Sequence, residues 1–226
     1  MKKGFTLAEV LITLSIVGII AALTVPSIVS NYKNRVYISG VKKAVAELEH
    51  ATKAIMNDEH VDDFYKTTAA AKNEVSIDGL TYSNGAEYFL NTYFKWQDDT
   101  RDKCVSGEYK TKAGVDAVTI ASNDGTYCSK NTNGIAYCMR YNDDTDDTEP
   151  FMSVFFDING KAAPNITGID AFVVRINEDG SLEDTDTSEP VDDGPKKCFN
   201  SVGSDVRDHA AGCLKQLMDN NWVYPE

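Results

Sequence analysis

A single carboxylate interrupts the most apolar stretch of the chain. Residues 5–25 are mostly Leu, Ile, Val and Ala, and Glu9 is the only charged residue among them. A charged side chain inside a membrane costs roughly 2.5–3.5 kcal/mol at the centre of a helix, and less near its end. Pairing with an opposite charge offsets this cost. We therefore expect Glu9 to have a cationic partner and a specific task.

Five cysteines, all C-terminal to the apolar stretch, offer a second chemistry, which is disulfide formation. Five thiols allow two bridges and leave one thiol over. We predict a bond between Cys198 and Cys213, which would close a C-terminal loop and contribute about 3 kcal/mol in the chain-entropy model. A second bond is expected among Cys104, Cys128 and Cys138, whose pairing stays open. The absence of a C-x-x-C motif argues against zinc and redox sites.

Catalytic signatures are absent from the sequence. It has no Gly-x-Ser-x-Gly, no phosphate-binding glycine loop and no H-E-x-x-H motif. His50, His60 and His209 stand far apart and match no metal-ligand spacing. We predict that the protein is not an enzyme and holds no cofactor. Asp157 and Asn159 offer oxygen ligands for calcium in a D-I-N-G turn, but the glutamate of an EF-hand is missing, so an ordinary turn is favoured.

The apolar stretch is long enough to cross a membrane as a helix. At 1.5 Å per residue, residues 5–25 span about 30 Å, the thickness of the hydrocarbon core. The stretch is too long for the apolar region of a cleavable secretory signal, and a plain anchor has no use for Glu9. Lys2 and Lys3 precede it, so the positive-inside tendency places the N-terminus in the cytoplasm and the rest outside.

A helical pattern continues beyond Pro26. Apolar residues at spacings of three to five, with charged residues on other faces, predict an amphipathic helix over residues 26–57. The combined helix would run from Leu7 to Asn57 over about 75 Å, with a kink or local loosening at Pro26. One side of its second half must therefore pack on a globular partner.

Residues 58–226 have the pattern of an α+β head. Asn84 and Glu87 predict the N-terminal cap of a short helix, and residues 208–218 a C-terminal one. Alternating and apolar runs separated by turn signals predict strands at residues 115–121, 135–141, 152–158 and 171–176. Short strands joined by turns predict an antiparallel sheet that packs against the long helix.

The charge balance excludes two classes of partner. The chain has 22 basic and 35 acidic residues, for a formal net charge of −13. Proteins that bind nucleic acid need basic residues to neutralise phosphates, and anionic membrane surfaces attract basic patches. We therefore expect no nucleic acid. The acidic clusters at residues 143–149 and 178–193 are typical of solvated loops.

Residues 2–11, Lys-Lys-Gly-Phe-Thr-Leu-Ala-Glu-Val-Leu, resemble the prepilin-type cleavage and methylation segment of type IV pilin-like proteins. The combination of Gly4, Phe5, Glu9 and Pro26 with the apolar run is highly specific. The resemblance implies a leader of residues 1–4, which a prepilin peptidase removes after Gly4, and methylation of the new α-amine of Phe5. Glu9 would pair with the α-amine of a neighbouring subunit during filament assembly, and Pro26 stands where many members have a proline.

The resemblance also implies a fold, a location and partners. The fold would be pilin-like α+β, with a long N-terminal helix, transmembrane in its first half, packed on a C-terminal antiparallel sheet. The protein would cross the bacterial inner membrane once, with residues 58–226 outside the cytoplasm, and would enter a filament on assembly. Its partners would be the prepilin peptidase, other pilin-like subunits of a homo- or hetero-filament, and inner-membrane lipid.

The type of filament stays open. A type II secretion pseudopilin and a minor type IV pilin both fit, and the large head favours a minor subunit. Residues 155–165, with Gly168, Asp170 and Phe172, look like pseudopilin heads, but this does not by itself define a role. A different class of function is a membrane-tethered extracytoplasmic binding module or enzyme that uses a pilin-like anchor.

Overall fold

The computed structural model describes residues 4, 6–95, 104–111, 114, 116–117, 126–142, 151–184, 198, 210 and 212–224. The chain divides into two compact units, Met1–Ser39 and Gly40–Glu226, and each is described by itself.

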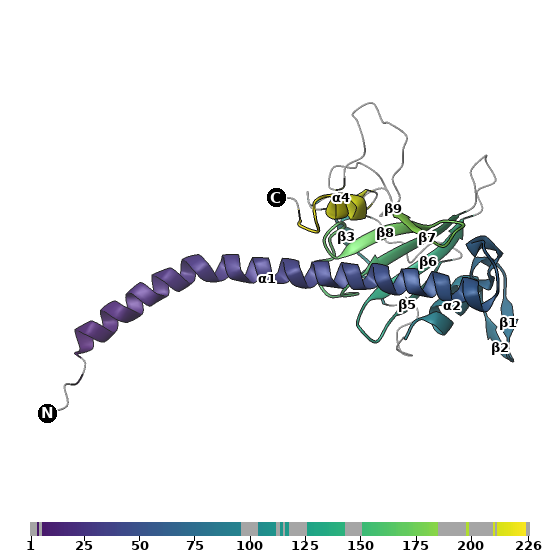
Figure 1. Ribbon diagram of the computed structural model, residues 1–226. Helices are drawn as coiled ribbons and strands as arrows, with labels where there is room; N and C mark the ends of the chain where they lie inside the picture. The colour runs from purple at the N-terminus through teal and green to yellow at the C-terminus, as the bar shows by residue number, and fades with distance from the viewer. Residues whose placement is uncertain are drawn as a thin grey trace. The chain divides into compact units, whose positions relative to one another are not determined.

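The first element is a 52-residue helix, α1 (Leu7–Asp58), which matches the predicted helix to within one residue at its end. It continues through Pro26 without a break (Figure 1). The expected loosening at Pro26 therefore does not interrupt the helix. A proline removes one backbone donor and crowds the preceding turn, and a long helix can absorb this locally.

The second half of α1 buries one side against the head. Its buried residues recur at helical spacing, so they share one face: Val41, Ala44, Leu48, Ala51, Thr52 and Ile55. Gly40 lies so close to Ile158 that an added Cβ would stand 3.2 Å from the Cδ1 atom of Ile158. The Thr52 hydroxyl donates to the carbonyl of Gly180 over 3.0 Å. These contacts hold the helix to the loops at both ends of the sheet.

The head is built on a five-stranded antiparallel sheet. Its strands follow one another in chain order: β5 (Tyr127–Lys130), β6 (Ala136–Asn142), β7 (Phe151–Asp157), β8 (Ala171–Ile176) and β9 (Leu182–Asp184). Strands β6, β7 and β8 lie within one residue of their predictions. Neighbouring strands pair in register, with Cys138 opposite Phe155 and Phe156 opposite Phe172. The predicted α+β class, with a long helix and an antiparallel sheet, is confirmed (Figure 1).

Several short strands escaped prediction. β5 and β9 are three or four residues long, too short for a clear alternation. β1 (Val75–Ile77) and β2 (Leu80–Tyr82) form a hairpin within a segment expected to be a connection. Its turn residues Asp78 and Gly79 both have positive φ, which is typical of the Asp-Gly turns that join hairpin strands. That dipeptide was the signal for the hairpin.

The predicted strand at residues 115–121 is only partly described. A two-residue strand, β4 (Asp116–Ala117), pairs with β3 (Tyr109–Lys110). The other predicted positions of this strand, residue 115 and residues 118–121, lie outside the described residues.

The short helices include one that has the cap predicted from the sequence. Two 3₁₀ turns, η1 (Phe64–Lys66) and η2 (Thr68–Ala70), precede α2 (Gly85–Tyr93). The Asn84 side chain accepts a hydrogen bond from the backbone N–H of Glu87 over 2.9 Å, which is the predicted cap of α2. The last helix, α4 (Cys213–Asp219), overlaps the predicted one, and residues 208, 209 and 211 lie outside the described part.

Aromatic rings link α2 to the sheet through the core. The ring centroids of Phe64 and Phe89 lie 5.8 Å apart, those of Phe89 and Phe94 5.7 Å, and those of Phe94 and Tyr137 4.8 Å. All four side chains are buried. Such pairs add to the free energy gained by burying apolar area, so this chain of rings fixes α2 on the sheet.

Candidate functional site

The first turn of α1 is closed by a reciprocal pair of side chains. The backbone N–H and the hydroxyl of Thr6 both donate to Glu9 Oε2, each over 2.8 Å. The backbone N–H of Glu9 donates back to the Thr6 hydroxyl over 3.3 Å. This is the Thr-x-x-Glu capping box, which satisfies donors that a helix N-terminus leaves without partners. Glu9 therefore has a local structural role in addition to the one expected of it.

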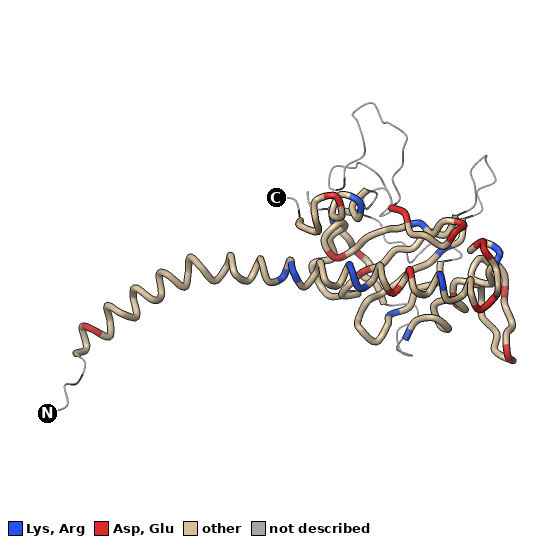
Figure 2. Tube along the Cα trace, in the orientation of Figure 1, with Lys and Arg blue, Asp and Glu red and all other residues tan. Residues whose placement is uncertain are grey.

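The first part of α1 is an apolar rod with one charge. Glu9 is the only charged residue between Leu7 and Tyr32, and Figure 2 shows this stretch almost free of charged positions. Its large apolar side chains are exposed within the unit, as the fractions of 81% for Leu7 and 75% for Leu23 illustrate. An apolar surface of this extent requires lipid or protein around it.

By length and composition, α1 is able to cross a membrane, and among the described residues it is the only helix of which this holds. None of the residues in its most apolar 18-residue window is buried within the protein. A core helix of a water-soluble domain would bury such a stretch, so α1 differs from one in this respect.

The structure describes most of the expected processing and assembly residues. Gly4 is exposed, and an added Cβ would meet no atom within 4 Å. Glu9 lies five residues further on in the first turns of α1, and Pro26 lies within the helix. Phe5 falls outside the described residues. Thr6 was missed, although the Thr-x-x-Glu spacing before an apolar run is a recognisable signal.

The comparisons with known proteins bear on this N-terminal segment. The family model of the prokaryotic N-terminal methylation motif matches residues 1–25. No curated protein and no solved structure matches the chain. The motif, together with the long apolar helix and the antiparallel sheet, supports a type IV pilin-like protein. The motif implies processing by a prepilin peptidase and assembly with pilin subunits, and the apolar helix fits membrane anchoring.

Two disulfides lie in the head. Cys198 is bonded to Cys213, the pair expected from the sequence, and Cys128 is bonded to Cys138. The second bond joins residues directly opposite each other on β5 and β6. Cys104 is a free, buried thiol. The pairing that the sequence left open is thus decided by strand register.

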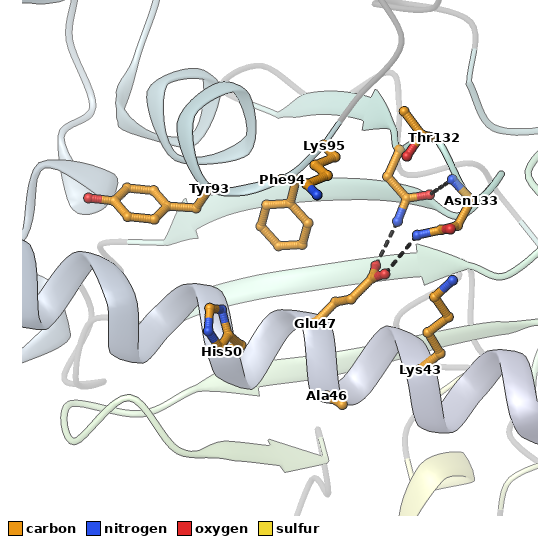
Figure 3. Close-up of a pocket in the computed structure, with 10 residues that line it drawn as sticks. Lys43, Ala46, Glu47, His50, Tyr93, Phe94, Lys95, Thr132 and Asn133 are labelled. Carbon is orange, nitrogen blue, oxygen red and sulfur yellow. Dashed lines mark hydrogen bonds between the residues drawn. The ribbon is translucent and has the colours of Figure 1, made fainter.

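An open cavity of about 660 Å³ lies between α1, the end of α2 and the turn that joins β5 to β6 (Figure 3). Lys43, Glu47 and His50 line it from α1, and Lys95 and Asn133 from the other two elements. The three histidines were expected to match no metal-ligand spacing. His50 lies at this cavity, His60 lies in the turn after α1, and His209 is outside the described residues.

Glu47 is held in this cavity by hydrogen bonds from three side chains. Its Oε2 accepts hydrogen bonds from Asn131 Nδ2 over 2.6 Å and from the Tyr137 hydroxyl over 3.0 Å, and its Oε1 accepts one from Asn133 Nδ2 over 2.9 Å. Burial, with the nearby Glu47 carboxylate, raises the pKa of Tyr137 far above its usual value. The carboxylate is therefore an anchor between helix and sheet. No local sequence motif predicts this role of Glu47, because its partners lie more than eighty residues away along the chain.

The turn that was considered for calcium is held by the protein's own hydrogen bonds. The backbone N–H of Asn159 donates to Asp157 Oδ1 over 2.9 Å, and the Asn159 amide donates to the carbonyl of Ala162 over 2.9 Å. The carboxylate of Asp170 accepts from the backbone N–H groups of Asn165 and Ile166. These bonds hold the turn together, and the expectation that it binds no calcium ion stays a prediction.

Proposed function

We propose that this protein is a structural subunit of a type IV pilus-like filament or of a type II secretion pseudopilus. In this proposal a prepilin peptidase cleaves after Gly4, and the new N-terminal amine of Phe5 is methylated. The observation that carries the proposal is the apolar first part of α1, which follows the methylation motif and bears Glu9 as its single charge. No catalytic role is assigned to the head.

The apolar first part of α1 fits both the membrane-embedded subunit before assembly and the subunit in a filament. Before assembly the hydrocarbon core of the inner membrane would cover the exposed side chains of α1, and in a filament the helices of neighbouring subunits would cover them. Cleavage at Gly4 removes Lys2 and Lys3 with the leader. The mature end then begins with an apolar residue and a free amine.

Glu9 supplies the partner for that amine. A carboxylate inside lipid or a filament core is costly unless an opposite charge compensates it. The α-amine of a neighbouring mature subunit is a cation of suitable size that every copy carries. Pairing would set the axial register between subunits, because only one stagger brings the two charges together.

The test is the mass and N-terminal sequence of the protein isolated from its native host. We expect a chain that lacks residues 1–4, begins at Phe5 and carries one added methyl group. A chain that still begins at Met1, or one cut near residue 26, would contradict processing at Gly4.

The choice between pilus and pseudopilus needs a second experiment. Filaments sheared from the cell surface would contain a pilus subunit, whereas a pseudopilus subunit would stay with the envelope, and its deletion would stop export of secreted proteins. The resemblance of residues 155–165 to pseudopilin heads supports the second case. A membrane-tethered binding module would show neither filament incorporation nor an export defect.

A further inference from the structure

Three of the five cysteines lie together in the core of the head. The Sγ atoms of Cys104, Cys128 and Cys138 all lie within 4.8 Å of one another. Cys128 and Cys138 are bonded to each other, and Cys104 keeps its thiol. All three side chains are buried in one cluster with Tyr109 and Phe155. The free thiol therefore has a disulfide in its immediate surroundings while it is shielded from reagents in solution.

We propose that these three residues, called here the cysteine trio, form an intramolecular thiol–disulfide exchange site. The thiolate of Cys104 attacks the Sγ atom of Cys128 or Cys138 and forms a new S–S bond, while the bond between Cys128 and Cys138 breaks. The displaced sulfur leaves as a thiolate and takes up the proton that Cys104 released. One disulfide and one thiol exist before and after the step, so it needs no external oxidant or reductant.

The surroundings of Cys104 set the rate of this exchange. Burial raises the pKa of the Cys104 thiol to about 11, although the positive charges of Lys161 and Lys130 act in the opposite direction. Because only the thiolate attacks, little of the reactive form exists at neutral pH. Exchange is therefore slow in the folded head and accelerates as the pH rises toward this pKa.

Exchange would change which segments of the head the disulfide joins. The bond between Cys128 and Cys138 joins two strands that are already paired by backbone hydrogen bonds. A bond from Cys104 to either of them would instead tie the segment before β3 to the central sheet and close a longer loop. A longer loop restricts the unfolded chain more. The trio thus gives the head alternative covalent forms with the same number of disulfides.

The first test uses single serine variants of the full chain in detergent micelles. Free thiols are alkylated in acid denaturant, and the disulfide bonds are then assigned by peptide mass mapping. After oxidation of each variant with oxidised glutathione, which accepts the two electrons, we expect a bond between Cys104 and Cys128 in Cys138→Ser, and one between Cys104 and Cys138 in Cys128→Ser. The bond between Cys198 and Cys213 is the internal control and should persist in both. Two alkylated thiols from the trio in both variants, with a cooperative thermal transition retained, would overturn the proposal.

A second test needs no substitution, so it decides the matter even where a variant fails to fold. The wild-type chain is held at pH 7 or pH 9 and then quenched in acid denaturant with an alkylating reagent. We expect one label per chain, on Cys104 after pH 7 and partly on Cys128 or Cys138 after pH 9. Label confined to Cys104 at both pH values would overturn the exchange.

Discussion

The hydroxyl of Tyr109 donates a hydrogen bond to Asp157 Oδ2 over 2.7 Å, and both side chains are almost completely buried. This contact joins β3 to the end of β7, two segments that the sequence places far apart. The carboxyl of Asp170 is also buried nearby. Asp157 is thus a buried acid beside a phenol, backbone amides and another acid. Its protonation state therefore affects the stability of the head.

Asp157 makes the stability of the protein depend on pH. Burial, and next the charge of Asp170, raises the pKa of Asp157 to about 7 from an ordinary value near 3.8. At pH below 4 the carboxyl is protonated in both the folded and the unfolded chain. Between pH 4 and 7 the unfolded chain releases this proton while the folded chain keeps it, so stability falls as the pH rises. The pKa of Asp170 is raised as well and adds to the same trend.

We expect this loss to be on the order of 3 kcal/mol between pH 4 and pH 8. In Asp157→Asn the slope should flatten, because the amide does not titrate. The measurement is the thermal transition of the full chain in detergent micelles at several pH values. An unchanged difference between pH 4 and pH 8 in the variant would show that other groups cause the dependence.

Substitutions at Glu9 and Thr6 separate the charge of Glu9 from its capping role. Glu9→Gln keeps a side chain that can complete the capping box but removes the charge. If Glu9 pairs with the α-amine of a neighbour, then Glu9→Gln and Glu9→Ala should both permit leader cleavage and both impair incorporation into filaments. Thr6→Val, which loses the box at a cost of about 1 kcal/mol of helix stability, should assemble nearly as well as wild type.

The readouts are the mass of the mature chain and the fraction of it that is recovered in filaments. Normal assembly by Glu9→Gln together with failure of Thr6→Val would reverse the interpretation. Glu9 would then act as a helix cap and not as an assembly charge.

Removal of the Glu47 carboxylate should loosen α1 from the sheet. Glu47→Ala leaves the buried Asn131 and the hydroxyl of Tyr137 without this acceptor, which we expect to cost about 1–3 kcal/mol. Glu49→Ala is the matched control, because Glu49 is exposed on the same helix two residues away. The free energies of unfolding of both variants check this, and an equal effect at the two positions would contradict the role of Glu47 as an anchor.

Gly85, the first residue of α2, has no room for a side chain. An added Cβ would stand 2.6 Å from the carbonyl oxygen of Ala69 and closer still to that of Thr68, and both are backbone atoms that cannot rotate away. Gly85→Ala should therefore destabilise the head by about 1–3 kcal/mol. Gly107→Ala serves as the control, since no atom lies within 4 Å of its added Cβ. Thermal unfolding of the two variants distinguishes a specific clash from a general effect of adding a methyl group.

Local patterns predicted much of the fold because their physical causes are local. The length of α1 followed from helical spacing, the cap of α2 from Asn84 and Glu87, and strands β6 to β8 from apolar runs between turns. The hairpin of β1 and β2 was missed, although its Asp-Gly dipeptide is a sequence signal for a hairpin turn. The capping box of Thr6 and Glu9 was also missed, although its Thr-x-x-Glu spacing is a local signal.

What the sequence by itself determined is the N-terminal segment, in which the motif, the apolar length and the single charge are all contiguous. Only the tertiary structure decided the pairing of Cys128 with Cys138, the position of Cys104 beside them, and the partners of Glu47 and Asp157. The reason is physical: strand register and the packing of helix on sheet bring together residues from distant segments, and no spacing along the chain encodes such contacts.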